Sequence, residues 1–589
     1  MEENSFQVYG NRRVIFWLSG EMCEKPEELI LSPSFRKFLD LALKNLQRRK
    51  SPLLQIFGET RITEKALEKL IETFLYLTKL EGQKVPQIVE GSETFFRDQE
   101  LFNDFVEYLY NYWRHFERFV IVSDTARDTF DQRPYRTFNE TIERLTHLVR
   151  GVYRDIQEHI TYQHPRVYRQ AQAGADVAAI ASPKEITFPG SVYDPLQQVP
   201  IIRQVLLYPP LVLEPPNNKR TGQFQKVEDN PFPEGYVFHP RKWICYPAKV
   251  GELTILVYFH ETFFELGFSL CNLFQLAGDE DLKRPPDGIY LYGLPEHFLS
   301  EHAPLPTVFY DDQEHDLILG AVPDSEMFGY FGYLKKMILT QHNVKIMKKG
   351  RLPFHGALAS IYMEGKKANV LIMGESGAGK SETLEALRVL GQGRVGEISI
   401  IADDMGSVKL DDQGCALGYG TEIGAFVRLD DLQPGYAFGQ IGRAIFMSPS
   451  ETNARALLPV NLYNNIIKGE PLDIILYANN YQEVDGSHPV IEQFSSPEKA
   501  LEVFRAGRVM SKGTTTSKGL IGTYFANIFG APQYKNLHEE IAKHYFESFF
   551  EHGLFVGELR TRLGLEGWEQ KGPAAAAECL LDLMDRLQL

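Results

Sequence analysis

The chain has 589 residues, 43% of them hydrophobic and 24% charged, which is ordinary for a globular protein of two to four domains. Its formal net charge of −16 excludes general nucleic-acid binding, which needs a basic face. No run of about 18 apolar residues is present, the N-terminus lacks a signal-peptide core, and the cysteines form no CxxC pair. We therefore expect a cytoplasmic protein with free thiols and with no membrane or nucleic-acid partner.

Changes in residue composition and apolar periodicity along the sequence predict three domains in a mixed α/β fold. Residues 1–110 carry apolar side chains at helical spacing and are predicted to form a helical N-terminal extension. Residues 111–340 begin near the strand-like run FVIVSD, and their proline-rich stretch at 180–250 suits loops and short edge strands. Further strand candidates there are ELTILVYF, GIYLYG and DLILGAV. In residues 341–589 the apolar runs ANVLIM, ISIIADD and LDIILYANN lead into polar residues, where α/β proteins place their sites.

A phosphate-binding loop is the strongest motif. GESGAGKS at 374–381 matches G-x-x-x-x-G-K-[ST] completely, with a predicted strand before it and a predicted helix after it. Its glycines let backbone N–H groups point at phosphate oxygens, and the helix N-terminus adds partial positive charge. The pattern predicts that ATP or another nucleoside triphosphate binds with a divalent metal through Gly374, Glu375, Ser376, Gly377, Ala378, Gly379, Lys380 and Ser381.

An acidic pair, Asp403 and Asp404, closes the apolar run ISIIADD. Adjacent carboxylates at a strand end suit a hard divalent cation, and one of them could act as a base. A surface turn is the alternative interpretation. Lys380 is expected against the β- and γ-phosphates, and the Ser381 hydroxyl against the Mg²⁺ that bridges them.

Other polar residues near the loop indicate little by themselves. His355 alone would be interpreted as a structural histidine, Lys335 and Lys336 as a solvated helix face, and Arg455 as a surface arginine.

From about residue 112 to its end, however, the chain resembles the ATP-dependent phosphoenolpyruvate carboxykinases. The segments that carry the resemblance keep the family's order: FVIVSDTARDTF, LILGAVPDSEMFGYFGYLKKM, PFHGALAS, GESGAGKS, IADD, NARALLP and GRVMSKGTTTSKGLIGTYFANIFGAP. The resemblance implies a carboxykinase-like two-lobed core, with residues 111–340 as the substrate domain and residues 341–589 as the nucleotide- and metal-binding domain.

The resemblance also implies a metal site. Lys336, His355 and Asp404 would hold a catalytic Mn²⁺, with Asp403 beside them, while Ser381 would serve the Mg²⁺ of the nucleotide. A lysine binds a metal only when neutral, so the pKa of Lys336 must be lowered.

A substrate pocket is implied in the same way. Tyr330, Ser376 and Arg455 would line it, and Arg114 would clamp a substrate carboxylate. The residues that would take part in catalysis are Lys336, Lys380, Asp404 and Arg455. The implied substrate is a small dicarboxylate, and the implied reaction is the reversible conversion of oxaloacetate and ATP to phosphoenolpyruvate, CO₂ and ADP, with Mn²⁺ stabilising the enolate.

Two alternatives stay open. The segment HGALASIYMEGKKANVLIMGESGAGKSETLEAL, followed by IADD, also resembles HPr kinase/phosphorylase, and Glu382 after the loop is closer to that family. This likeness implies a kinase for a protein serine or a small-molecule hydroxyl, with Asp403 or Asp404 as base.

The second alternative rests on two departures from the carboxykinases. GYGTEIGAFVRLDD has no lysine where that family has one that reaches the γ-phosphate, so Arg428 would have to substitute, and LEGWEQKGPAAAA has only Lys571 as a basic residue where the family binds adenine. A degenerate member would bind nucleotide and assemble with a protein partner through residues 1–110. Because the segment LEGWEQKGPAAAA differs from the adenine-binding segment of the carboxykinases, ATP, GTP and pyrophosphate all stay open as phosphoryl donors.

Overall fold

The computed structural model describes residues 5–9, 12–18, 22–58, 62–123, 132–163, 170–222, 224–299, 307–363, 366–391, 394–431, 438–512 and 518–587. The chain forms two compact units: the N-terminal unit, Met1–Pro183 with Ile202–Tyr208, and the C-terminal unit, Lys184–Ile201 with Pro209–Leu589. These limits differ from the predicted divisions at 110/111 and 340/341, which stay predictions. Both units mix helices with sheets, so the mixed α/β class is confirmed.

The N-terminal unit contains a sheet that its helical sequence pattern does not reveal. Its strands are β1 (Ser5–Tyr9), β2 (Arg13–Leu18), β3 (Glu117–Ser123), β4 (Val177–Ser182) and β5 (Ile201–Leu207), in that order. β2 pairs with β3 in parallel, and β3 with β4 in parallel. The run FVIVSD is therefore a strand as predicted, but it belongs to the same sheet as residues 5–18.

The helices of this unit follow the predicted periodicity. They are α1 (Pro26–Ile30), α2 (Pro33–Arg48), α3 (Glu64–Leu77), α4 (Gln99–Arg114) and α5 (Gln132–Thr161), with 3-10 turns at Pro52–Phe57, Val85–Gln87 and Ser92–Thr94. The Ser32 side chain caps α2 by accepting a hydrogen bond from the Phe35 backbone N–H at 3.0 Å, so α1 and α2 are separate helices. Aromatic and aliphatic side chains from these helices form one apolar cluster.

The first sheet of the C-terminal unit carries several of the predicted strands. Its order is β8 (Trp243–Val250), β9 (Leu253–His260), β11 (Gly288–Leu294), β13 (Leu317–Pro323), β12 (Val308–Asp312) and β7 (Gln225–Val227), with β10 (Gln275–Leu276) beside β8. β9, β11 and β13 are buried along almost their whole length, as continuous apolar runs predict. Short helical segments Ser191–Gln198, Glu261–Phe263, α6 (Phe264–Ser269), Leu270–Asn272, Asp281–Lys283, Glu296–Phe298 and Glu326–Phe328 connect them.

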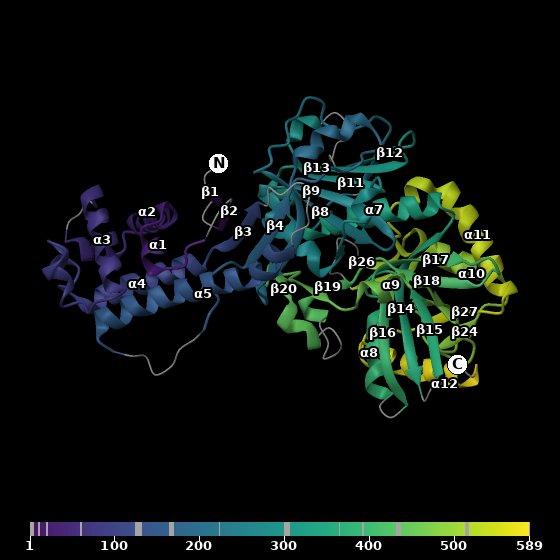
Figure 1. The fold of residues 1–589 in the computed structure, drawn as a ribbon. Helices are drawn as coiled ribbons and strands as arrows, with labels where there is room; N and C mark the ends of the chain where they lie inside the picture. The colour runs from purple at the N-terminus through teal and green to yellow at the C-terminus, as the bar shows by residue number, and fades with distance from the viewer. Residues whose placement is uncertain are drawn as a thin grey trace. The chain divides into compact units, whose positions relative to one another are not determined.

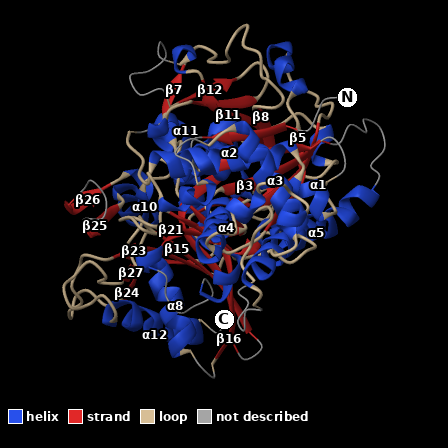
Figure 2. Cartoon of the chain, turned by 90° about the vertical axis from the view of Figure 1, so that its left-hand side faces the viewer, coloured by secondary structure: helices blue, strands red, loops and turns tan. Residues whose placement is uncertain are grey.

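The phosphate loop belongs to a second sheet of this unit. Its order is β22 (Glu470–Pro471), β18 (Ala416–Gly420), β17 (Met405–Leu410), β14 (Leu352–Met363), β15 (Lys366–Met373), β23 (Ile474–Asn479), β27 (Phe555–Arg560) and β24 (Ile491–Gln493), with β16 (Val395–Ala402) also pairing with β14. β15, β23 and β27 run parallel. α8 (Lys380–Leu390) and α12 (Lys571–Arg586) lie side by side against these strands (Figures 1 and 2).

Smaller elements complete the C-terminal unit. A third sheet has the order β19 (Gly424–Arg428), β21 (Arg455–Pro459), β20 (Ile445–Met447) and β6 (Leu211–Leu213), and β25 (Arg508–Lys512) forms a hairpin with β26 (Lys518–Gly522). The remaining helices are α7 (Phe331–Lys348), α9 (Tyr463–Ile467), α10 (Pro497–Ala506) and α11 (Lys535–Glu551), with 3-10 turns at Leu429–Asp431, Phe438–Arg443, Tyr524–Ala526 and Ala531–Tyr534. Within the described ranges, no helix combines the length and apolar character needed to cross a bilayer.

α7 is buried on nearly every side, although its sequence contains four lysines. Its His342 is 1% exposed, and Nδ1 lies 3.0 Å from the Asn343 side-chain oxygen. Burial lowers the pKa of His342 to about 4. The imidazole therefore stays neutral in the folded protein over a pH range in which an unfolded histidine is charged.

We expect the C-terminal unit to lose stability as pH falls from about 6.5 to about 4. In that window the unfolded chain binds a proton that buried His342 does not, which costs roughly 3 kcal/mol when complete. Denaturant midpoints at pH 7.5 and pH 4.5 should show a smaller fall for His342→Gln than for the wild type. An equal fall in both proteins would contradict the assignment.

Candidate functional site

The predicted phosphate loop connects β15 to α8, as its motif requires. Gly377 and Gly379 have φ values of +80° and +95°, which L-residues with a side chain rarely adopt. A Cβ at Gly379 would also lie 2.7 Å from the Thr561 side chain. The Lys380 ammonium donates to the carbonyl oxygens of Gly374 and Glu375, at 2.8 and 3.1 Å, so the loop curls around its own lysine.

Two polar side chains from neighbouring strands hold the loop. Asn480 follows β23, and its amide donates to the Gly377 carbonyl and the Met510 carbonyl, each at 2.9 Å. Thr561 follows β27, and its hydroxyl donates to the Ala378 carbonyl at 2.7 Å. Because the parallel strands end at the same edge of the sheet, residues distant in sequence reach the loop together.

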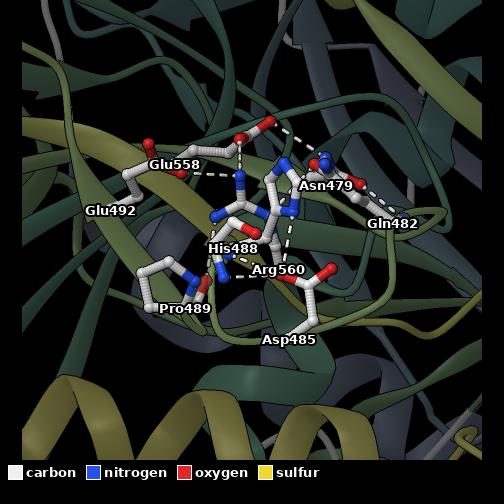
Figure 3. A network of polar contacts seen from close by, with 9 residues as sticks. Asn479, Gln482, Asp485, His488, Pro489, Glu492, Glu558 and Arg560 are labelled. Atoms are coloured by element: carbon white, nitrogen blue, oxygen red, sulfur yellow. Dashed lines mark hydrogen bonds and ion pairs between the residues drawn. The ribbon is translucent and has the colours of Figure 1, made fainter.

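Arg560, the residue before Thr561, lies at the centre of a polar network (Figure 3). It donates to the carboxylates of Glu492 and Glu558 at 2.7 and 2.9 Å, and to the side chain of Gln482 at 3.0 Å and the Pro489 carbonyl at 2.8 Å. Asn479 donates to the other oxygen of Glu558 at 2.9 Å. The network fixes the ends of β23 and β27. It thereby also positions Asn480 and Thr561, the two residues that support the loop.

A strained segment supports the loop from another direction. Phe525, Ala526 and Asn527 have consecutive φ values of 47°, 56° and 65°, a costly arrangement for residues other than glycine. The Asn527 amide donates to Glu375 in the phosphate loop at 3.1 Å, and the Thr523 hydroxyl donates to the same carboxylate. The sequence contains no local signal for these contacts, and residues 513–517 of the preceding Gly/Thr-rich turn lie outside the described residues.

The acidic pair lies beside the phosphate loop. Ser381 donates from its hydroxyl to Asp403 at 3.3 Å. Asp404 contacts His355, with Nε2 to Oδ1 at 2.9 Å, and its backbone carbonyl accepts from Gly356 N–H at 2.9 Å. The His355 carbonyl in turn accepts from the Gly374 N–H at 3.0 Å. Backbone and side-chain contacts thus connect the imidazole and the carboxylates to the first glycine of the loop.

Lys335 is the residue that the sequence interpretation missed. It is 4% exposed, so the solvated helix face expected for the lysine pair is wrong at this position. Its ammonium lies 2.7 Å from Asp404 Oδ2 and 3.2 Å from Glu422 Oε1. Lys335 lies on a buried face of α7, where an ammonium needs acidic partners, and here it has two.

The ionisation of this group follows from burial and charge. Although burial opposes ionisation, Lys335 and His355 hold the pKa of Asp404 well below its usual range. Burial raises the pKa of Glu422 to about 8, against the attraction of Lys335 and with the repulsion of Asp404. Burial also lowers the pKa of Lys380, which nearby acids led by Asp404 oppose.

Lys336 lies next to this group, on the ring of Phe529. Its ammonium is 5.0 Å from the ring centroid, and the His355 ring centroid is 6.3 Å from the same Phe529 centroid. Burial, followed by repulsion from Arg220, lowers the pKa of Lys336 to about 8. The lowered pKa that the resemblance requires of this lysine is therefore present.

Predicted substrate residues gather around a different ring, that of Phe426. The Arg455 guanidinium is 5.4 Å from its centroid, and the Tyr330 ring centroid is 6.1 Å away. Arg455 also donates to the Asn453 side chain at 2.8 Å. Arg428 is the direct cross-strand partner of Arg455 in the β19–β21 pair, so two guanidinium-bearing positions lie together.

The other two predicted substrate residues, Ser376 and Arg114, have different surroundings. Ser376 is exposed at the tip of the phosphate loop. Arg114 is the last residue of α4 in the N-terminal unit, where its guanidinium donates to the Gln172 carbonyl at 3.3 Å and to the Asn111 side chain at 3.4 Å. Its role as a carboxylate clamp stays a prediction. The RDTF segment at 127–130 lies outside the described residues.

The predicted Mn²⁺ site can be tested against the hydrogen bonds of His355. Its Nδ1 donates to the Ala526 carbonyl, whereas its buried Nε2 lies 2.9 Å from Asp404 Oδ1 without a hydrogen-bond partner among the described residues. An imidazole that donates from Nδ1 has its lone pair on Nε2, and a cation shared with Asp404 would satisfy that lone pair. Imidazole, carboxylate and a neutral lysine fit a divalent transition metal.

A third ligand for such an ion would have to be Lys336. Within the part of the chain that the structure describes, no three His, Cys, Asp or Glu side chains form a cluster suited to a metal. The contact between the Ser381 hydroxyl and Asp403 fits the oxygen ligands that Mg²⁺ prefers.

No family model matches this chain, and a search of curated proteins finds none that does.

Removing the buried lysine should destabilise the C-terminal unit. In Lys335→Met, Asp404 and Glu422 lose the cation between them, which we expect to lower the free energy of unfolding by about 3 kcal/mol. Chemical denaturation measures the loss, and adding Glu422→Gln should restore part of it. The control is Lys349→Met at the exposed end of α7. Equal midpoints for the two lysine variants would argue against the ion triad.

Lys380→Met should abolish nucleotide binding without unfolding the protein. The Nζ atom lies within the loop, where it would meet the phosphates. Calorimetric titration with Mg·ATP should show a loss of at least about 100-fold in affinity. Lys366→Met, on the exposed start of the preceding strand β15, is the matched control. Undiminished ATP binding by Lys380→Met would refute the role of the loop.

Proposed function

We propose that this chain is a nucleotide-dependent phosphoryl-transfer enzyme with a carboxykinase-like core, and that its reaction is the reversible conversion of oxaloacetate and ATP to phosphoenolpyruvate, CO₂ and ADP. The observation that carries the proposal is the convergence of His355, Asp404 and the lysine pair beside Lys380 and Ser381. A phosphate loop alone would fit many enzymes. A lysine of lowered pKa and an imidazole beside its acidic pair fit far fewer.

In this proposal, separate groups of residues bind the nucleotide and the Mn²⁺. Lys380 and the loop N–H groups would bind the phosphates, and Ser381 with Asp403 would hold the Mg²⁺ of the nucleotide. Lys336, His355 and Asp404 would hold Mn²⁺, which would polarise the oxaloacetate oxygens and stabilise the enolate after loss of CO₂. Lys335 would keep Asp404 ionised and turned toward His355, because it already occupies Oδ2.

The state of Asp404 favours this reaction over transfer to a hydroxyl. Decarboxylation itself generates the nucleophile, so no general base is needed. A hydroxyl acceptor requires one, and Asp404, whose pKa is held well below its usual range, is a weak base. The HPr-kinase-like alternative therefore depends on Asp403, which contacts Ser381.

A turnover assay decides between these reactions. The full chain is incubated with ATP, GTP or pyrophosphate, with and without oxaloacetate and Mn²⁺, and both nucleotide consumption and phosphoenolpyruvate are measured. We expect consumption to depend strictly on oxaloacetate. Tight nucleotide binding without that dependence would overturn the proposal and favour a hydroxyl kinase or a non-enzymatic, partner-binding role.

Lys336 should be needed for turnover more than for nucleotide binding. We expect Lys336→Met to lower kcat/KM for oxaloacetate by about 100-fold while Mg·ATP affinity changes little, because this lysine serves the Mn²⁺ site and not the loop. Lys349→Met, at the C-cap of the same helix, is the control, since its ammonium pairs with Glu252 at 3.6 Å and with Asp287 at 3.5 Å. Equal losses in turnover and in ATP affinity would contradict the proposal that Lys336 serves the Mn²⁺ site and not the phosphate loop.

A further inference from the structure

The N-terminal unit has a partly open cavity of about 560 Å³ between its sheet and its helices. Phe16 and Val120 line it from strands β2 and β3, and Phe38, Trp113 and Val149 line it from helices α2, α4 and α5. Its walls combine residues of the helical apolar cluster with residues of the apolar cluster on the sheet, and Phe16 packs against both. The volume falls within the range of about 300–1,000 Å³ that is usual for small-molecule sites.

Large apolar side chains face this space without being fully buried. Phe16, Phe35, Trp113 and Val149 are all only partly buried, although each lies inside the unit between sheet and helices. Along α5, Leu145, Val149, Val152 and Ile156 recur at helical spacing and form one continuous apolar wall. A molecule that covered these surfaces would remove apolar area from water without any change in the fold.

The two charged residues of the lining already have partners within the protein. Arg118 pairs with Asp176 at 2.5 Å, and its remaining guanidinium N–H groups donate to backbone carbonyls, among them that of Gly174 at 2.6 Å. Glu28 accepts from the backbone N–H groups of residues 24 and 25. Burial raises the pKa of the Cys23 thiol, which keeps it neutral.

The hydroxyl of Tyr153 in the lining also has a partner within the unit. Tyr153 donates its hydroxyl to Glu107, and its ring stacks on Tyr110 with centroids 3.8 Å apart, so the cavity meets the faces and edges of rings. An ionised ligand group placed here would lose its hydration and find no uncommitted counter-charge among the lining residues. An apolar chain would lose nothing and would gain contacts with the aromatic walls.

We propose that this cavity binds an uncharged hydrocarbon chain, of the acyl or isoprenoid kind, with no ionised head group. The site is separate from the phosphate loop and does not depend on the proposed phosphoryl transfer, because all of its lining residues belong to the N-terminal unit.

The test uses the full chain and the uncharged fluorescent probe N-phenyl-1-naphthylamine. We expect saturable binding near one probe per chain and displacement by 1-dodecanol or by farnesol. Dodecanoate, which differs from 1-dodecanol in its ionised head, should compete at least 10-fold more weakly. Stronger competition by the straight-chain alcohol indicates an acyl ligand, and stronger competition by farnesol an isoprenoid one. Equal competition by dodecanoate and 1-dodecanol would overturn the assignment of an uncharged ligand.

Filling the cavity should abolish binding. Val149→Trp places a large ring in the space, and we expect probe affinity to fall at least 10-fold. His147→Trp, on the exposed side of the same helix, is the matched control and should bind as the wild type does. Leu145→Trp provides a second filling variant should Val149→Trp fail to fold, as judged by circular dichroism. Wild-type affinity in a folded filling variant, or binding of many probes per chain, would refute the site.

Discussion

The contact of a buried ammonium with two acidic side chains is the interaction on which the rest of the candidate site depends. Lys335 reaches Asp404 and Glu422 from the N-terminal part of a helix that is buried on nearly every side. Each charge alone would be costly to bury, so the three groups are stable only together. Their arrangement leaves one oxygen of Asp404 facing His355, and so determines which part of the acidic pair can take part in chemistry.

The phosphate loop owes its shape to residues far away in the sequence. Asn480 and Thr561 hold two of its carbonyls, and the Arg560 network holds both of them in place. On another side, Glu375 is fixed by Asn527 from a segment with three consecutive left-handed residues. Local motif chemistry supplies the glycines and the lysine, but a folded sheet is needed to present them.

The sequence predicts those parts of the structure that local pattern controls. The loop at 374–381, its flanking strand and helix, and the acidic strand end are all present where a motif or an apolar run indicated them. The sequence pattern does not predict strands β1 and β2, because both are short and are followed by long segments with helical periodicity. Lys335, Glu422 and Asn527 were missed for a different reason: their partners lie at long sequence separation, and no spacing rule connects them.

The long strand β14 has a consequence for the whole site. Its first residues, Leu352–His355, pair with β17, whereas Leu358–Met363 pair with β16, so the strand changes neighbour just after the imidazole. If the pairing of Leu358–Met363 with β16 shifted by one residue, each side chain of β14 would point to the opposite face of the sheet. His355 would then point away from Asp404. The alignment of an ordinary stretch of sheet thereby sets where the imidazole points.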